Sequence, residues 1–501
     1  MLNKRGCGIL LHPTSLPGSG GIGTLGADAR RFIDLLHDLG MSYWQVLPLA
    51  PPALGNSPYS ALSAFGGNPL LIDLELLERE GDLAPAPMGH FPVERVDFAA
   101  VTGAKMARLY LAGATFLAQK GTARSLEFDH FCNTTPWLHD FALFVVLKRH
   151  FANKSWSQWP REASRITPQA YAKFSQQFDQ EIAVQKYLQW QFARQWQQLR
   201  TYANERGIAV IGDLPIFVAH DSADVWRHPE LFLLDGQGQP TVVAGVPPDY
   251  FSLTGQRWGN PHYDWHTLEQ AGYQWWIERF KMMYVLFDIV RIDHFRGFEA
   301  SWQVPAKEKT AEKGLWVKGP GQKFFAALQT ALGALPIIAE DLGFITPEVE
   351  VLRDSNNFPG MKILQFAFDS GPANPYLPHN HLKNMVVYTG THDNDTTKGW
   401  YDSISAAERD EMNAYLGTSG DDCVGNLIRA ALMSVADTAI IPFQDILKLG
   451  NQARMNLPGT AFGNWEWRFS WDMLQPELAA SLRGQVRRYG RAQHGDTTDA
   501  S

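Results

Sequence analysis

The chain has 501 residues, of which 45% are hydrophobic and 19% are charged, a composition that excludes a disordered protein and indicates a large core. Its formal net charge is −8 and it has no basic run, which argues against nucleic acid as its main partner. The three cysteines form no CxxC pair, and no apolar run has the length of a membrane span or a signal-peptide core. We therefore expect a cytoplasmic protein with no disulfide framework and no membrane partner.

The N-terminal residues predict a strand, a glycine-rich loop and a helix. Residues 8–11 are apolar, and a helical pattern covers residues 28–39. Within the loop, Gly18, Gly20 and Gly23 match the GxGxxG fingerprint of dinucleotide-binding proteins. Prolines separate the first of these glycines from the strand, and the next strand ends without a ribose-binding acid. We therefore interpret this segment as an ordinary loop rather than as a nucleotide site.

A long helical stretch separates the second predicted strand, over residues 43–47, from the third, which begins at Ile208. Helical patterns cover residues 105–119, 137–151 and 167–206. A strand-to-strand step in a barrel needs far fewer residues, so we predict a helical subdomain inserted over residues 70–170. Residues 217–270 are rich in proline, glycine and aromatic residues, and we predict there a loop-rich insertion that forms part of a substrate cleft.

Apolar runs separated by helical sequence are the main argument for the fold. Eight such runs cover residues 8–11, 43–47, 208–211, 285–294, 335–341, 361–366, 385–388 and 438–441. Eight strands that alternate with helices predict an α/β protein with a (β/α)8 TIM barrel. We expect one catalytic barrel domain over residues 1–490 with inserted helical and loop subdomains, no separate C-terminal β domain, and a polar tail over residues 491–501.

Ionisable residues follow several of these strands, where the active site of a barrel enzyme forms. They are Asp213, Arg291, Asp293, His294, Glu340, Asp341, His392 and Asp393. Arg291 and Asp293 are two residues apart, so on a strand they point to the same side. An arginine beside an aspartate favours the ionised carboxylate, which suits a nucleophile, an electrostatic stabiliser or a purely structural ion pair.

Carboxylates gathered with arginine and histidine suit either a metal site or glycoside chemistry. A metal site would need a tight cluster such as HxH or HExxH, which is absent, and Arg291 would oppose a cation. In glycoside chemistry, one carboxylate attacks the anomeric carbon while a second protonates the leaving oxygen. Asp293 suits the first task and Glu340 the second, and Asp393 could stabilise the transition state. We therefore predict no metal.

Four segments, at residues 212–215, 291–294, 338–343 and 390–393, resemble the conserved regions of the α-amylase superfamily. Further segments carry a closer resemblance; they lie at residues 8–17, 57–60, 247–251, 256–261, 291–297, 389–396 and 454–465. In these segments the chain is similar to glycoside hydrolase family 77, the 4-α-glucanotransferases called amylomaltases or disproportionating enzymes. The resemblance runs from about residue 5 to residue 470.

This resemblance implies a retaining 4-α-glucanotransferase that moves α-1,4-glucan segments between maltooligosaccharides or starch-type glucans, with cyclisation as a variant. It implies no cofactor and no metal, with Asp293 as nucleophile, Glu340 as acid/base and Asp393 as transition-state stabiliser. Asp393 is chosen over Asp395 because the superfamily's acid follows the histidine directly. The implied sugar-binding residues are Ser57, Tyr59, Asp213, Asp249, Tyr250, Phe251, Trp258, Arg291, His294, His392 and Asn464.

Two other functions stay open at this point. An α-1,4-glucan hydrolase would use the same three carboxylates with water as the acceptor. The aromatic loop over residues 246–258 favours transfer, because a lid over the site would shield the intermediate from water. A glycan-binding protein on an inactive barrel would require the loss of one carboxylate, and all three are present.

Overall fold

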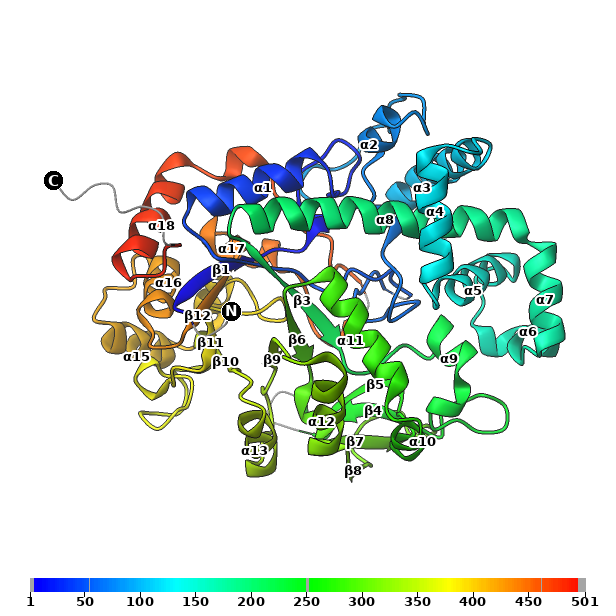
Figure 1. Ribbon diagram of the computed structural model, residues 1–501. Helices are drawn as coiled ribbons and strands as arrows, with labels where there is room; N and C mark the ends of the chain where they lie inside the picture. The colour runs from blue at the N-terminus through cyan, green and yellow to red at the C-terminus, as the bar shows by residue number, and fades with distance from the viewer. Residues whose placement is uncertain (1–3, 54, 249–251, 461, 494–501) are drawn as a thin grey trace.

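The computed structural model describes residues 4–53, 55–248, 252–460 and 462–493. Three of the predicted sugar-binding residues, Asp249, Tyr250 and Phe251, lie outside the described residues. Figure 1 shows a central barrel of strands surrounded by helices, with a further group of helices, α3 to α7, beside it.

Eight parallel strands form the central sheet, in the order β10-β11-β12-β1-β2-β3-β6-β9 (Figure 1). They are β1 (Gly6–Leu10), β2 (Tyr43–Gln45), β3 (Ala209–Pro215), β6 (Ile289–Asp293), β9 (Ile337–Ala339), β10 (Gly360–Ile363), β11 (Met385–Tyr388) and β12 (Thr438–Pro442). The backbone N–H of Ala339 donates to the carbonyl of Pro359 at 2.9 Å, which brings β9 to β10 and nearly closes the barrel. Each strand overlaps one of the predicted apolar runs, so the predicted (β/α)8 barrel is confirmed.

The strands form because their side chains are apolar on both faces, as a parallel sheet covered by helices requires. In β6, Ile289, Val290 and Ile292 are fully buried. The predicted strand at residues 285–294 began too early, because Val285 is exposed at the end of a helix. Short apolar runs do not distinguish the end of a helix from the start of a strand.

The helices cover the outside of the barrel and fill the long crossings between strands (Figure 1). They are α1 (Ala27–Asp38), α2 (Leu74–Arg79), α3 (Phe98–Leu117), α4 (Ala123–Thr134), α5 (Leu138–His150), α6 (Arg161–Ser164), α7 (Pro168–Gln177), α8 (Asp179–Glu205), α9 (Ala223–Arg227), α10 (Trp265–Gln270), α11 (Gln274–Leu286), α12 (Gly321–Leu332), α13 (Pro347–Ser355), α14 (Thr397–Ser403), α15 (Ala406–Leu416), α16 (Cys423–Met433), α17 (Phe443–Ile446) and α18 (Pro476–Arg488). No described helix is long and apolar enough to cross a membrane.

Helices α2 to α8 all lie between β2 and β3. The single helical pattern predicted over residues 167–206 is two helices, because the backbone leaves the helical region at Phe178 between α7 and α8. Polar pairs join the group: Arg124 of α4 donates to Asp82 at 2.8 Å, and Arg194 of α8 donates to Glu80 at 2.9 Å. The long helix α8 then leads back to the barrel as the helix before β3.

A second, antiparallel sheet of four strands lies beside the barrel, in the order β5-β4-β7-β8. Its strands are β4 (Val242–Val246), β5 (Gln256–Pro261), β7 (Ala300–Pro305) and β8 (Leu315–Lys318). Sequence reasoning missed this sheet and expected only loops around β4 and β5. Local patterns do not reveal it because β4 and β5 are short. In addition, β7, which pairs with β4, comes later in the chain, after the barrel strand β6. A side chain at Gly245 would place its Cβ 2.3 Å from the carbonyl of Gln256, so the β4–β5 pairing needs glycine there.

Residues 491–493, the start of the predicted polar tail, pack against the barrel. Arg491 is fully buried, and its Nη1 donates to the carbonyls of Gly6 at 2.7 Å and Asp437 at 3.1 Å. Gln493 donates to the carbonyl of Gly207 at 2.8 Å. The start of the predicted tail therefore closes the end of the barrel where the strands begin, because a buried guanidinium satisfies several carbonyls at once.

Candidate active site

The candidate site lies at the carboxyl ends of the barrel strands, where the strand register brings the predicted residues together. β3 and β6 pair Asp213 with Arg291. β6 and β9 pair Ile292 with Ala339, so Asp293 and Glu340 each follow a paired residue on neighbouring strands. Neighbouring strands lie about 4.8 Å apart. The two acids therefore reach the mouth of the barrel side by side.

Arg291 links the carboxylates of β3 and β6. Its Nη1 donates to Asp213 Oδ2 at 2.6 Å, and its Nη2 donates to Asp293 Oδ1 at 3.2 Å. The hydroxyl of Tyr59 donates to the same oxygen of Asp213 at 2.7 Å. Asp213 and Arg291 are buried, whereas the side chain of Asp293 is 30% exposed. Asp213 thus orients Arg291 and Tyr59, and Asp293 is the acid of this group that the solvent can reach.

The carboxyl group of Glu340 accepts hydrogen bonds from two backbone N–H groups. Its Oε2 accepts from the backbone N–H of His294 at 2.6 Å, and its Oε1 accepts from the backbone N–H of Leu342 at 3.0 Å. His294 adopts a left-handed backbone with φ of 54°, a conformation that costs energy in a residue other than glycine. Strained backbone of this kind is common at functional sites. Here the strained residue, His294, supplies one of the two N–H groups that donate to Glu340.

Two histidines, His294 and His392, contact aromatic residues at the site. The ring of His294 packs edge-on against Trp258, with ring centroids 4.8 Å apart and planes at 88°. The ring of His392 stacks on Tyr59 at 5.0 Å and 12°, and Trp465 lies beside both rings. Burial lowers the pKa of His294 to about 3 and also lowers the pKa of His392. Both are therefore neutral near pH 7 and suit hydrogen bonding to hydroxyl groups.

Among the predicted acids that the structure describes, Asp393 is the most open, with 48% of its side chain exposed. Its Oδ1 accepts from Asn456 Nδ2 at 2.6 Å, and its backbone carbonyl accepts from Arg454 at 2.7 Å. The alternative acid, Asp395, accepts from Asn451 at 2.6 Å and from the backbone N–H of Thr396 at 2.7 Å. Asp393 Oδ2 lies 3.4 Å from His392 Nε2, so Asp393 contacts this histidine.

Three further predicted residues, Ser57, Asn464 and Asp341, accept hydrogen bonds from backbone N–H groups of nearby segments. Ser57 Oγ accepts from the backbone N–H of Tyr59 at 3.3 Å and so supports the turn that carries Tyr59. Asn464 accepts from the backbone N–H of Leu457 at 2.9 Å and orders the loop that precedes Trp465. Asp341 accepts from the backbone N–H of Met361 at 2.7 Å and from Arg353, so it joins β9 to β10.

Sequence reasoning did not name three residues that the structure places at the site, namely Phe217, Asn456 and Trp465. Phe217 follows β3 and packs at 6.3 Å from His294 and 6.5 Å from Trp258. The family-like segment at residues 454–465 was the signal for the other two. No pattern in the sequence marked Phe217, because an aromatic residue after a strand is usually part of the core.

Burial dominates the electrostatics of the two central acids. Although 30% of the Asp293 side chain is exposed, burial of the rest raises the pKa of Asp293 well above its usual range, and Arg291 opposes this rise. Burial also raises the pKa of Glu340, against Arg291 and the two backbone N–H bonds. Arg291 favours the ionised form of Asp293, as the sequence predicted, but it does not outweigh burial in the free protein. The site therefore holds a proton more tightly than free carboxyls would.

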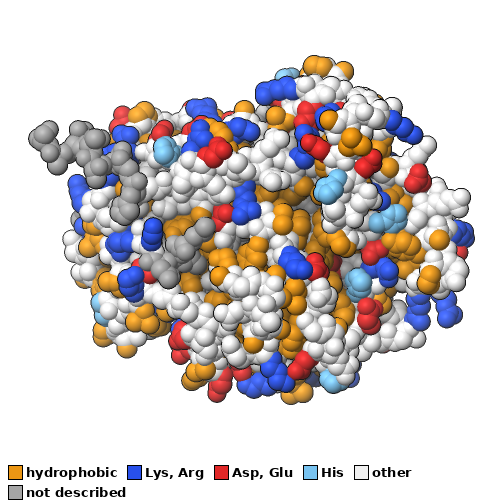
Figure 2. Space-filling model, in the orientation of Figure 1, with side chains coloured by type: hydrophobic (Ala, Val, Ile, Leu, Met, Phe, Trp, Pro, Cys, Tyr) orange, Lys and Arg blue, Asp and Glu red, His pale blue; other side chains and the backbone are white. Residues whose placement is uncertain are grey.

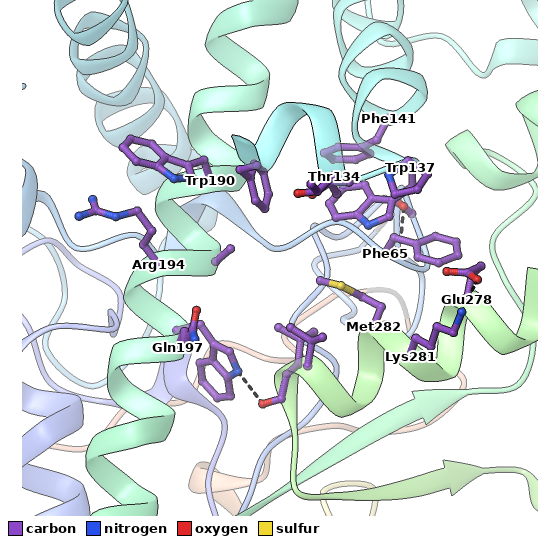
Figure 3. A pocket seen from close by; sticks show the side chains of 18 of the residues that line it. Phe65, Thr134, Trp137, Phe141, Trp190, Arg194, Gln197, Glu278, Lys281 and Met282 are labelled. Carbon is purple, nitrogen blue, oxygen red and sulfur yellow. Dashed lines mark hydrogen bonds and ion pairs between the residues drawn. The ribbon is translucent and has the colours of Figure 1, made fainter. Parts of the chain in front are cut away.

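A cavity of about 1170 Å³ lies apart from this site, between α8, α11 and the helices α4 and α5 (Figure 3). Its lining includes Phe65, Trp137, Trp190 and Met282, and Figure 2 shows apolar side chains exposed in this hollow. None of the candidate site residues is among those that line it. The cavity is therefore separate from the strand ends.

Carboxylates, an arginine and neutral histidines at the carboxyl ends of a (β/α)8 barrel are typical of carbohydrate-active barrel enzymes. The chain belongs to the 4-α-glucanotransferase family, whose model matches residues 11–474. A 4-α-glucanotransferase of Synechocystis is 51% identical over 499 residues, covering 98% of this chain and 99% of the relative. One of Thermus thermophilus is 49% identical over 491 residues, covering 96% and 98%.

The fold agrees with that of a solved member of the family. The structure of an amylomaltase from Streptococcus agalactiae, in complex with acarbose, superposes with a TM-score of 0.95 at 37% identity and covers 98% of this chain and all of that one. The predicted family is thus confirmed. The protein is an enzyme with 4-α-glucanotransferase activity, and its substrates are α-glucans.

Proposed function

We propose that the enzyme works by a retaining mechanism in which Asp293 is the nucleophile and Glu340 is the acid/base. The observation that carries the proposal is the register of β6 and β9, which sets these two acids on adjacent strands at the same level. Retaining enzymes hold their two carboxyl groups about 5 Å apart, close to the spacing of neighbouring strands. Inverting enzymes need a wider gap that admits a water molecule.

In the first half of the reaction, Asp293 attacks the anomeric carbon of an α-1,4-glucan. The glycosidic C–O bond breaks as Glu340 donates its proton to the leaving oxygen, and the released glucan departs. Asp393, half-exposed beside His392, stabilises the positive charge that develops on the sugar ring. The neutral rings of His294 and His392 supply hydrogen bonds to ring hydroxyls.

In the second half, the 4-hydroxyl of another glucan attacks the glycosyl–Asp293 bond. Glu340 now takes the proton of that hydroxyl, a new α-1,4 bond forms and Asp293 is released. Cyclisation is the same step with the acceptor hydroxyl at the other end of the bound chain. Trp258, exposed on β5 next to His294, offers a stacking face for a sugar ring. We also propose that Asp249, Tyr250 and Phe251, which lie outside the described residues, bind sugar.

Product analysis on pure maltotriose tests this function against the alternative, an α-1,4-glucan hydrolase. Water is far more concentrated than any sugar, so transfer wins only where the site excludes water and binds the acceptor. We expect glucose together with maltopentaose and longer glucans, while total reducing ends stay almost constant. Reducing ends that rise in step with the maltotriose consumed would identify a hydrolase instead.

The rate should depend on pH as a bell, because Asp293 must be ionised while Glu340 is protonated. Since burial raises the pKa of Asp293, the acidic limb of kcat/KM should lie above the range of a free aspartate. Since burial also raises the pKa of Glu340, the alkaline limb should lie above the range of a free glutamate. Both limbs belong to the coupled pair rather than to single groups. A bell centred below these ranges would contradict the burial that the structure shows.

We propose that catalysis needs neither a cofactor nor a metal, so a chelator should leave the rate unchanged. We also propose that residues 70–170 act as an inserted helical subdomain and that residues 217–270 form one wall of the cleft, in support of which Trp258 contacts His294. The three cysteines are free, which supports a cytoplasmic location.

A further inference from the structure

Arg296 is a buried arginine that the mechanism above does not use. Its side chain is 4% exposed, and no described carboxylate lies within ion-pair distance of it. Its guanidinium instead donates to the carbonyls of Phe344 and, at 3.4 Å, Ala300, and lies 3.7 Å from the ring centroid of Trp316. Burying a charge without an ion pair costs free energy, and burial accordingly lowers the pKa of Arg296. A buried arginine of this kind can serve the fold alone or can also have a function.

The position of Arg296 in the chain suggests one. His294, two residues before it, donates its backbone N–H to Glu340 Oε2. Leu342, two residues before Phe344, donates its backbone N–H to Glu340 Oε1. The hydrogen bond from Arg296 to the Phe344 carbonyl therefore ties together the two turns that grip the carboxyl of Glu340 from either side.

We propose that Arg296 is a positioning residue for Glu340, holding the turns of His294 and Leu342 at the separation that lets both of them bind its carboxyl. This proposal rests on the acid/base role of Glu340 given above. The small antiparallel sheet then has a part in catalysis, because β8 supplies Trp316 as the face on which Arg296 lies.

Arginine suits this place better than lysine. A planar guanidinium can lie flat on an indole ring and donate in its own plane to carbonyls on two sides. The ring of Trp316 is itself held edge-on by Trp302, whose centroid is 5.4 Å away, and Trp302 Nε1 donates to the carbonyl of Ala311 at 2.9 Å. Lysine could reach one carbonyl but would not stack in the same way, so it should restore only part of the function.

The test compares Arg296→Met with Arg296→Lys on two substrates. Maltotriose needs a proton from Glu340, whereas α-maltosyl fluoride releases fluoride without one. We expect Arg296→Met to lower kcat/KM for maltotriose by about 10²-fold, within the range of general acid catalysis, and to leave fluoride release nearly unchanged. The kcat/KM of Arg296→Lys for maltotriose should lie between those of Arg296→Met and the wild type.

The pH profile supplies a second readout that a merely structural role would not move. Both backbone N–H bonds lower the pKa of Glu340, so loosening them should shift the alkaline limb to higher pH. The ionisable groups that face Glu340 are Arg291, Asp293, Asp341 and Tyr376, and all of them are kept in the variants. Arg296→Lys also keeps the positive charge, so a shift of the limb that this variant shares with Arg296→Met reports on the two N–H donors rather than on the lost charge.

Arg491→Met is the matched control, because Arg491 is also a buried arginine held by carbonyls, at the opposite end of the barrel. This substitution should destabilise the fold without changing the ratio of kcat/KM for maltotriose to kcat/KM for α-maltosyl fluoride, and without shifting the alkaline limb of the pH profile. If Arg296→Met behaves like this control, with equal losses on both substrates and no shift of the limb, the proposal is overturned.

Two more variants keep the outcomes separate. Trp316→Leu leaves Arg296 in place without its stacking face and should show a smaller effect of the same kind, even if Arg296→Met does not fold. Glu340→Gln tests the premise: if it loses activity equally on maltotriose and on α-maltosyl fluoride, the acid/base assignment itself fails. If Glu340→Gln separates the substrates and both the Arg296 and Trp316 variants do not, only the positioning role is wrong.

Discussion

We expect the replacement of Asp293 by asparagine to abolish glucan transfer, with a loss of kcat on the order of 10⁴-fold or more, the scale on which removing a nucleophile acts. The amide keeps the shape of the side chain but does not form a glycosyl bond. We expect none of the described acids to take its place. Asp213 is buried between Arg291 and Tyr59, the carboxyl of Glu340 accepts from two backbone N–H groups, and Asp393 accepts from Asn456. Disproportionation of maltotriose measures the loss.

Two controls make this result specific. Because the folded-state pKa of Asp293 is raised above its unfolded value, ionising it at neutral pH costs folding free energy that asparagine does not incur. We therefore expect the Tm of Asp293→Asn at pH 7 to equal or exceed that of the wild type, and such a Tm would show that the loss of activity does not come from unfolding. A sugar trapped on the wild-type enzyme should be found on Asp293; a label on any other residue would refute the assignment.

We expect Glu340→Gln to lower kcat/KM for maltotriose by about 10²- to 10⁴-fold, the usual contribution of a general acid. The same variant should still form the glycosyl enzyme from α-maltosyl fluoride, whose leaving group needs no proton. The intermediate should then accumulate, because no base remains to deprotonate the acceptor. A burst of fluoride in the first turnover, measured by stopped flow, reports this directly.

Azide serves as the control for that result, because it is an anion that attacks without losing a proton. Added azide should restore turnover of α-maltosyl fluoride in Glu340→Gln and have little effect on the wild type. Glutamine leaves one of the two backbone donors, His294 or Leu342, without an acceptor, so a modest loss of Tm is expected as well. Equal losses on both substrates, with no rescue by azide, would show that Glu340 is not the acid/base.

Much of the fold could be read from local sequence patterns. A parallel strand inside a shell of helices is apolar on both faces, and runs such as residues 385–388 and 438–441 show this without any knowledge of their neighbours. The same patterns missed the antiparallel sheet, since β4 pairs with β7 across a barrel strand and the pairing leaves no local signal. They also placed the start of β6 too early, inside the end of α11.

The sequence by itself determined which acids follow barrel strands, and family-like segments around Asp293, Glu340 and Asp393 indicated the chemistry. Only the tertiary structure decided which of these acids lie together at the site. Asp445 follows β12 in the same way but accepts from Thr389 and Thr397, so it holds the loop after β11 and does not join the central acids.

The same holds for the electrostatics of the site. The pair Arg291–Asp293 could be seen in the sequence, and it predicted an ionised aspartate. Burial, which raises the pKa of Asp293, depends on every residue packed around the mouth of the barrel. The grip of His294 and Leu342 on Glu340 depends likewise on turns that Arg296 brings together from two strands. Sequence patterns report the residues next to one another in the chain, whereas desolvation and hydrogen bonding are set by neighbours in space.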